Sequence, residues 1–108
     1  MADPQIEKIK SAVAAADHIP RDKKTELLDL VAKLEPAISR ISETHGEHAD
    51  RISTLVEQSV RTASDNDQEH LETTLDELKQ SVRRFEASHP DLVSFVTEYS
   101  AFLSALGI

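Results

Sequence analysis

The chain contains no cysteine and no tryptophan, and only two of its 108 residues are glycine. Without cysteine there are no disulfides, no thiolate nucleophiles and no thiolate metal ligands. Phosphate-binding loops, nucleophile elbows and dinucleotide-binding turns need several glycines at fixed spacings, so two glycines cannot build them. The same scarcity removes the turn residues of hairpin-rich sheets. These absences argue against an enzyme, against a bound cofactor and against an all-β fold.

Basic residues are also scarce, because twelve Lys and Arg face twenty Asp and Glu and the formal charge is -8. A phosphate backbone or an anionic membrane repels such a chain at long range. We therefore expect no nucleic-acid partner and no membrane partner. The small basic groups lie among acidic residues, which is typical of a solvated helix face. These groups are Arg21 with Lys23 and Lys24, and Lys79 with Arg83 and Arg84.

Long apolar runs are missing as well. No stretch approaches the roughly twenty uninterrupted apolar residues that a membrane helix needs. Residues 1–20 show neither the basic start nor the apolar segment of a secretion signal. We therefore expect a cytoplasmic location.

The few aromatic residues, three Phe and one Tyr, all lie between positions 71 and 106. Apolar residues in this segment recur at steps of four and three, the period of one helix face. The first stripe comprises Leu71, Leu75, Leu78, Val82 and Phe85, and the second comprises Leu92, Val96, Tyr99, Leu103 and Leu106. Between the stripes, Ser88 is the expected helix cap, His89 belongs to the turn, and Pro90 opens the last helix. The pattern predicts a helical hairpin that seeds the core.

Shorter stripes precede this hairpin. Asp3 and Pro4 suit the start of a first helix. The segment from His18 to Pro20 should end that helix. The later stripe keeps its phase across Pro36, so we expect a kink near Leu34 and not a stop. The residues from Ala63 to Asp67 form the turn before the hairpin. The three stripes are Ile6, Ile9, Val13 and Ala16; Leu27, Val31, Leu34, Ile38 and Ile41; and Ile52, Leu55, Val56 and Val60.

Residues 42–50 leave two alternatives open. One helix from about Asp22 to Thr62 would carry His45 and His48 on its apolar seam. Alternatively, the helix stops and Gly46 terminates it within a polar connector. We favour the long helix. The sequence thus predicts a single all-α domain over residues 1–108, an elongated antiparallel bundle of four to five helices with one long, kinked central helix.

The last helix carries unusually little charge, since Glu98 is the one charged residue between Leu92 and Ile108. Its apolar face is too wide for one neighbour to cover. Either this helix is central in the bundle, or part of it binds another copy of the chain or a different protein. Gly107 suits the position just past its end. The expected interface residues are Phe95, Tyr99, Phe102, Leu103 and Leu106.

Histidines are the groups that titrate near neutral pH. His45 and His48 are spaced for one helix face and are the candidates for a metal site. Two further ligands at a predictable spacing are missing, so a polar layer or a solvated connector is the favoured interpretation. Asp67 and His70 share this spacing, but the aspartate reads as a helix cap. The sharp turn before Pro90 accounts for His89 without chemistry.

The end of the chain resembles a known family. Residues 85–92 (FEASHPDL) and 103–108 (LSALGI) are similar to the C-terminal signature of a family of small bacterial helical proteins, catalogued as domain of unknown function 4404. The resemblance covers roughly the C-terminal third of the chain. It implies a small bacterial cytoplasmic protein and assigns no catalytic residues.

Three functions are consistent with these observations. The first is a non-catalytic protein-protein interaction module that forms a homodimer or binds another protein. The second is a metal-binding or pH-responsive helical protein that works through His45 and His48. The third is a leaderless secreted helical hairpin, although the chain lacks the tryptophan-glycine turn of such proteins.

Overall fold

The computed structural model describes residues 4–17, 19–65 and 67–106. These residues form helices and no strand, so the predicted all-α fold is confirmed. The helices are α1 (Pro4–Ala15), α2 (Arg21–Thr44), α3 (Gly46–Ser64), α4 (Gln68–Arg83) and α5 (Pro90–Ala105). The predicted helix cap at Asp3 and the helix end at Gly107 lie outside the described residues, as do His18 and Asn66.

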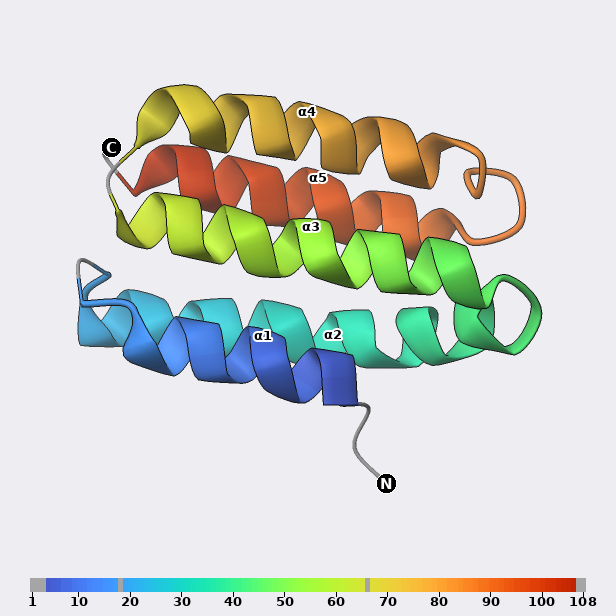
Figure 1. The fold of residues 1–108 in the computed structure, drawn as a ribbon, viewed down its shortest axis with the longest axis horizontal. Coiled ribbons are helices and arrows are strands. Elements are labelled where there is room, and N and C mark those ends of the chain that lie inside the picture. The colour runs from blue at the N-terminus through green and yellow to red at the C-terminus, as the bar shows by residue number, and fades with distance from the viewer. Residues whose placement is uncertain (1–3, 18, 66, 107–108) are drawn as a thin grey trace.

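The helices α2, α3, α4 and α5 form a four-helix bundle in which successive helices run in opposite directions (Figure 1). Helix α3 packs on α2 and α4, and α5 closes the ring by packing on the same two helices. Helix α1 lies outside this ring, against α2 and α3. The molecule measures 36 × 29 × 19 Å, so its longest dimension lies along the helices.

The four-and-three stripes form the core, as the sequence predicted. Every residue of the five stripes is buried except Leu106, which is partly buried. Helix α1 contributes Ile6, Ile9 and Val13, all with no exposed surface. Burying an aliphatic side chain stabilises a fold by about 1.5–3 kcal/mol. An isolated helix as short as α1 is marginal in water, so this burial holds it on the bundle.

The predicted continuous helix from Asp22 to Thr62 is wrong. Helix α2 ends at Thr44, and α3 begins at Gly46 after the single non-helical residue His45, whose φ is -137° and ψ is 62°. A continuous helix would be about 60 Å long at 1.5 Å per residue, far beyond the 36 Å length of the molecule. Folding back allows the α3 stripe to bury itself against α2.

Two further predictions, one for Pro36 in the helix and one for Gly46 in the alternative with a break, have separate outcomes. Helix α2 is 24 residues long and continues through Pro36, as the unbroken phase of its stripe predicted. Gly46 lies at the predicted break, but it is the first residue of α3 and does not terminate α2.

Of the helix caps predicted in the turns before and after α4, one is present and one is not. Asp67 caps α4, because its carboxylate accepts a hydrogen bond from the backbone N–H of His70 at 3.2 Å. Pro90 opens α5 as predicted, but Ser88 does not cap it. His89 occupies the cap position without a side-chain hydrogen bond to the helix. Its own N–H donates to the Phe85 carbonyl at 2.6 Å, so backbone bonding fixes this turn.

Most of the apolar surface of helix α5 is covered inside the bundle, as expected if this helix is central. It lies between α2 and α4 in the ring, and its core residues are buried by those helices and α3 within one copy of the chain. None of the described helices is both long and apolar enough to cross a bilayer.

Replacing Gly46 with alanine should raise the free energy of unfolding by up to about 1 kcal/mol, because alanine favours the helix more than glycine does. A Cβ atom at this position would meet no heavy atom within 4 Å. Urea unfolding followed by circular dichroism measures the change. A loss of stability would show that the turn needs glycine, and a larger hydrodynamic radius would show that α2 and α3 had fused.

Candidate functional site

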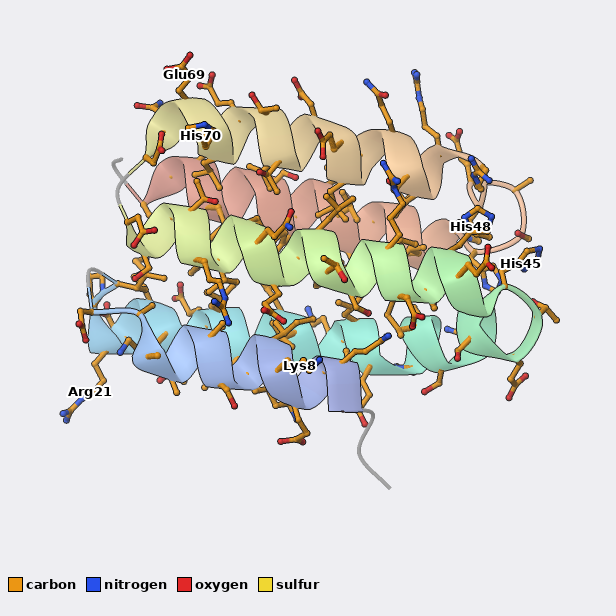
Figure 2. The ribbon with its side chains drawn as sticks, in the orientation of Figure 1. Lys8, Arg21, His45, His48, Glu69 and His70 are labelled. Carbon is orange, nitrogen blue, oxygen red and sulfur yellow. The ribbon has the colours of Figure 1, made fainter. Side chains whose placement is uncertain are left out.

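Three histidines gather at the end of the bundle where α2 meets α3 and α4 leads into α5. His45 and His48 lie there side by side (Figure 2), with ring centres 5.9 Å apart. The Phe85 ring contacts both edge-on, at 5.6 Å from His45 and 5.7 Å from His48. His89 packs on the same Phe85 ring, with the two ring centres 6.0 Å apart. A buried phenylalanine thus joins two chain reversals that are far apart in sequence.

Hydrogen bonds fix the chemical state of one of these histidines. Arg84 approaches Nε2 of His48 with its Nη1 at 3.0 Å. A guanidinium can only donate hydrogen bonds, so His48 accepts through an unprotonated Nε2 and is neutral in this arrangement. His45 Nδ1 lies 2.9 Å from the Thr44 hydroxyl. The three imidazole rings therefore pack around Phe85, and hydrogen bonds to Thr44 and Arg84 orient two of them.

The predicted pairing of His45 and His48 is present, but a set of metal ligands around it is not. Within residues 4–17, 19–65 and 67–106, no three His, Cys, Asp or Glu side chains are placed to hold one metal ion. His48 directs Nε2 to Arg84, and a cation beside a guanidinium is electrostatically unfavourable. The geometry therefore gives no support to the metal-binding alternative.

The sequence predicts that His89 belongs to the turn, but it gives no sign of the contact between His89 and Phe85 in this cluster. Its position before Pro90 does account for the cap position that it occupies. Its contact with Phe85, however, comes from the fold of the α4–α5 turn, in which the two residues are four apart. The only signal in the sequence was this spacing, which is too common to predict that Phe85 would contact His45, His48 and His89 together.

His70 lies at the opposite end of the bundle, at the start of α4 (Figure 2). Its Nδ1 forms a short ion pair with the carboxylate of Asp67. The hydrogen bond to Asp67 raises the pKa of His70, and its charge adds to the effect. The side-chain and backbone hydrogen bonds from His70 lower the pKa of Asp67. The predicted cap therefore also carries a charge pair.

One buried hydroxyl network crosses the core. Tyr99 is fully buried, and its hydroxyl donates to the Val56 carbonyl at 3.0 Å. The Ser59 hydroxyl bonds to the same carbonyl at 2.7 Å and also contacts the Tyr99 hydroxyl. Burial raises the pKa of Tyr99 far above its ordinary value, and the hydrogen bond from Ser59 opposes this only in part. The phenol is therefore neutral and structural, and it ties α5 to α3.

The five predicted interface residues divide into two groups. Phe95, Tyr99 and Leu103 are at most 5% exposed, so the chain covers them with its own helices and no partner is needed for their burial. Phe102 and Leu106 are only partly buried and pack at the edge of the core. These two are the predicted residues that solvent or a second protein can reach.

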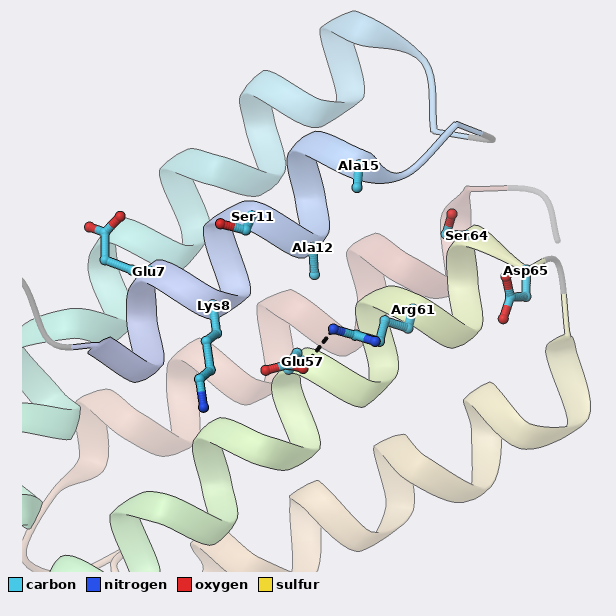
Figure 3. Close-up of a pocket in the computed structure, with 9 residues that line it drawn as sticks. All are labelled: Glu7, Lys8, Ser11, Ala12, Ala15, Glu57, Arg61, Ser64 and Asp65. Carbon is cyan, nitrogen blue, oxygen red and sulfur yellow. Dashed lines mark ion pairs between the residues drawn. The ribbon is translucent and has the colours of Figure 1, made fainter.

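A surface groove of about 840 Å³ lies between α1 and α3 (Figure 3). Ser11, Ala12 and Ala15 line its α1 side, and their small side chains leave the space open. Across the groove, Arg61 and Glu57 form an ion pair at 3.1 Å. The lining carries charges of both signs, which gives the groove no selective attraction for a charged ligand.

These features define a small all-α protein, a four-helix bundle with one additional N-terminal helix. The chain belongs to the family described as Domain of unknown function (DUF4404), whose profile matches residues 3–108. The family therefore extends over the whole bundle, well beyond the C-terminal third in which the sequence shows its resemblance. No curated protein and no solved structure matches the chain.

The Asp67–His70 pair should make a small, pH-dependent contribution to stability. Because the pKa of His70 is raised in the folded state, its contribution is present below the ordinary value of 6.5 and is lost as the pH rises through the folded pKa. The pKa of Asp67 is lowered, so its contribution is present above 3.8 and is lost as the pH falls through the folded pKa. The pair should therefore stabilise most between these two ordinary values.

An NMR titration of the histidine side chains tests this pair. Asp67→Asn should lower the pKa of His70 toward 6.5, because the carboxylate that stabilises the imidazolium is removed. Asp76→Asn removes the same charge from an exposed position of α4 and serves as the control. Equal pKa values for His70 in the wild type and in Asp67→Asn would contradict the ion pair.

Proposed function

We propose that this protein is a non-catalytic interaction module that forms a homodimer through the outer face of α5. That face consists of the exposed residues Ser94, Thr97, Glu98, Ala101 and Ala105. The main support for this proposal is that the outer face of α5 has almost no net charge, although the formal charge of the chain is -8. Two copies of so acidic a chain repel each other over most of their surfaces.

The charge of α5 is compensated within the chain. Its two acidic residues, Asp91 and Glu98, pair with basic residues of α2: Asp91 with Arg40, and Glu98 with Lys33 at 3.9 Å. Exposed ion pairs contribute little to stability, but these two remove the local charge that would oppose a second copy. Helix α4 differs, because its exposed surface includes Glu69, Glu72, Asp76 and Glu77.

Partly exposed apolar side chains flank the outer face on the side of α2. The two ion pairs are seven residues apart on each helix and run in opposite order, so they fix an antiparallel register. One helical turn further along, this register places Phe102 opposite the turn of α2 that contains Leu30. Both side chains are only partly buried. Aromatic side chains of this kind are common anchors of protein interfaces.

The composition of the chain supports a cytoplasmic location and argues against a nucleic-acid partner. A cysteine-free chain suits a reducing compartment, which supports a bacterial cytoplasmic location. Nucleic acid is a poor partner for a chain with twenty acidic and twelve basic residues. Two copies of the chain that meet across the neutral face of α5 avoid the repulsion between their acidic surfaces.

The substitution Ala101→Glu tests the dimer. Ala101 is exposed, so the fold should tolerate the change, but two new carboxylates would face each other across a two-fold interface. Light scattering at micromolar concentration should show a dimer for the wild type and a 12.0 kDa monomer for the variant. Phe102→Glu should have the same effect with some loss of stability, because Phe102 also packs on the core.

Ala32→Glu is the matched control. Ala32 is an exposed alanine in the middle of α2, and the helical period places it away from Lys33 and Arg40, which face α5. This variant should remain dimeric with an unchanged melting temperature. A monomeric wild type at these concentrations, or equal loss of the dimer in Ala32→Glu, would refute the proposed face.

A further inference from the structure

A second surface feature lies at the histidine end of the bundle, between α3 and α4. It is a polar pocket of about 430 Å³, lined by His48 and Arg51 from α3 and by Glu77, Gln80, Ser81 and Arg84 from α4 and its C-terminal cap. We infer that this pocket binds a phosphate group, either as inorganic phosphate or as a small phosphate monoester. This site is distinct from the outer face of α5 and does not depend on the proposed dimer.

The two guanidiniums of the pocket each donate a hydrogen bond to a side chain that is not a carboxylate. Arg51 Nε donates to the Ser81 hydroxyl at 3.4 Å, and Arg84 Nη1 donates to His48 Nε2 at 3.0 Å. Both acceptors are neutral. Of the other described arginines, Arg40 and Arg61 pair with the carboxylates of Asp91 and Glu57, whereas Arg21 and Arg83 form no ion pair among the described residues. This pocket thus holds two arginines of different elements, and neither forms an ion pair within the part of the chain that the structure describes.

The one carboxylate that lines the pocket does not change this balance. Glu77 forms no ion pair with Arg51 or Arg84 among the described residues. Two guanidiniums and one carboxylate leave the lining with a net positive charge. A cation is therefore disfavoured here and an anion is favoured, although the whole chain is strongly acidic.

The arrangement of the donors favours a phosphate group over a simple halide. Each guanidinium presents a planar fork of N–H donors that matches two oxygens of an oxyanion, and each keeps donors beyond the one it uses in the fold. The two arginines come from different helices, so they approach a bound group from two sides. Ser81 and His48 hold them in place, which reduces the loss of side-chain entropy on binding.

Sequence analysis grouped Arg84 with Lys79 and Arg83 as a solvated basic face. The structure separates them, because Arg84 turns toward α3 and contacts His48. Arg51 stands alone in the sequence between Asp50 and Ile52, so no local pattern joins it to Arg84. Only the packing of α3 against α4 creates the pocket.

Amide NMR spectra of the full chain, titrated with sodium phosphate against sodium chloride at equal ionic strength and fixed pH, test this inference. Phosphate should cause saturable shifts at His48, Arg51, Ser81 and Arg84, whereas chloride should not. Arg84→Gln should weaken phosphate binding by at least about tenfold, since a charged donor pair is removed. Arg51→Gln is a second variant with the same expected effect.

Arg61→Gln is the matched control, because Arg61 is an exposed arginine of α3 that pairs with Glu57 outside this pocket. It should bind phosphate as the wild type does. Shifts that fail to saturate, that chloride reproduces, or that persist unchanged in both Arg84→Gln and Arg51→Gln would overturn the inference. Tighter binding of phosphoserine than of phosphate would identify a monoester ligand, and equal or weaker binding would identify the free ion.

Discussion

The apolar face of α3 is the constraint on which the rest of the structure depends, because three other helices pack against it. Helix α3 contacts α1, α2 and α4, and Ile52, Val56 and Val60 have no exposed surface. Small buried residues make this crowding possible: Ala49, Ser53, Ser59 and Ala63 allow neighbouring backbones to approach closely. Besides α3, helix α1 packs only on α2 and helix α4 only on α5 among the main helix contacts of the described residues.

The core of α3 is also where the bundle becomes specific. Apolar stripes of similar spacing could pack in more than one order, since hydrophobic burial is not directional. The Tyr99 hydroxyl must find a partner when it is buried, and it finds one in the Val56 carbonyl. A shift of α5 along α3 would leave this phenol unpaired, at a cost of about 1–3 kcal/mol. Polar pairing therefore selects one register among apolar alternatives.

The two proposed functional surfaces arise from the distribution of charge. In a chain with eight more acidic than basic charges, surfaces that lack negative charge are exceptional. The outer face of α5 reaches neutrality because α2 supplies Lys33 and Arg40. The pocket between α3 and α4 becomes positive because Arg51 and Arg84 bond to neutral groups. Both properties belong to pairs of helices and not to any one segment.

The sequence by itself determined the local features: the helical class, the buried stripes, the helix start at Pro90 and the cap at Asp67, since these depend on residues within one turn. It favoured a single helix through residues 42–50, because periodicity cannot register how long a helix the core can cover. Only the tertiary structure decided that His45 ends α2, that Phe95, Tyr99 and Leu103 are covered within one copy, and that Phe85 and Arg84 contact His48. Such contacts depend on the packing of distant segments, which local periodicity does not encode.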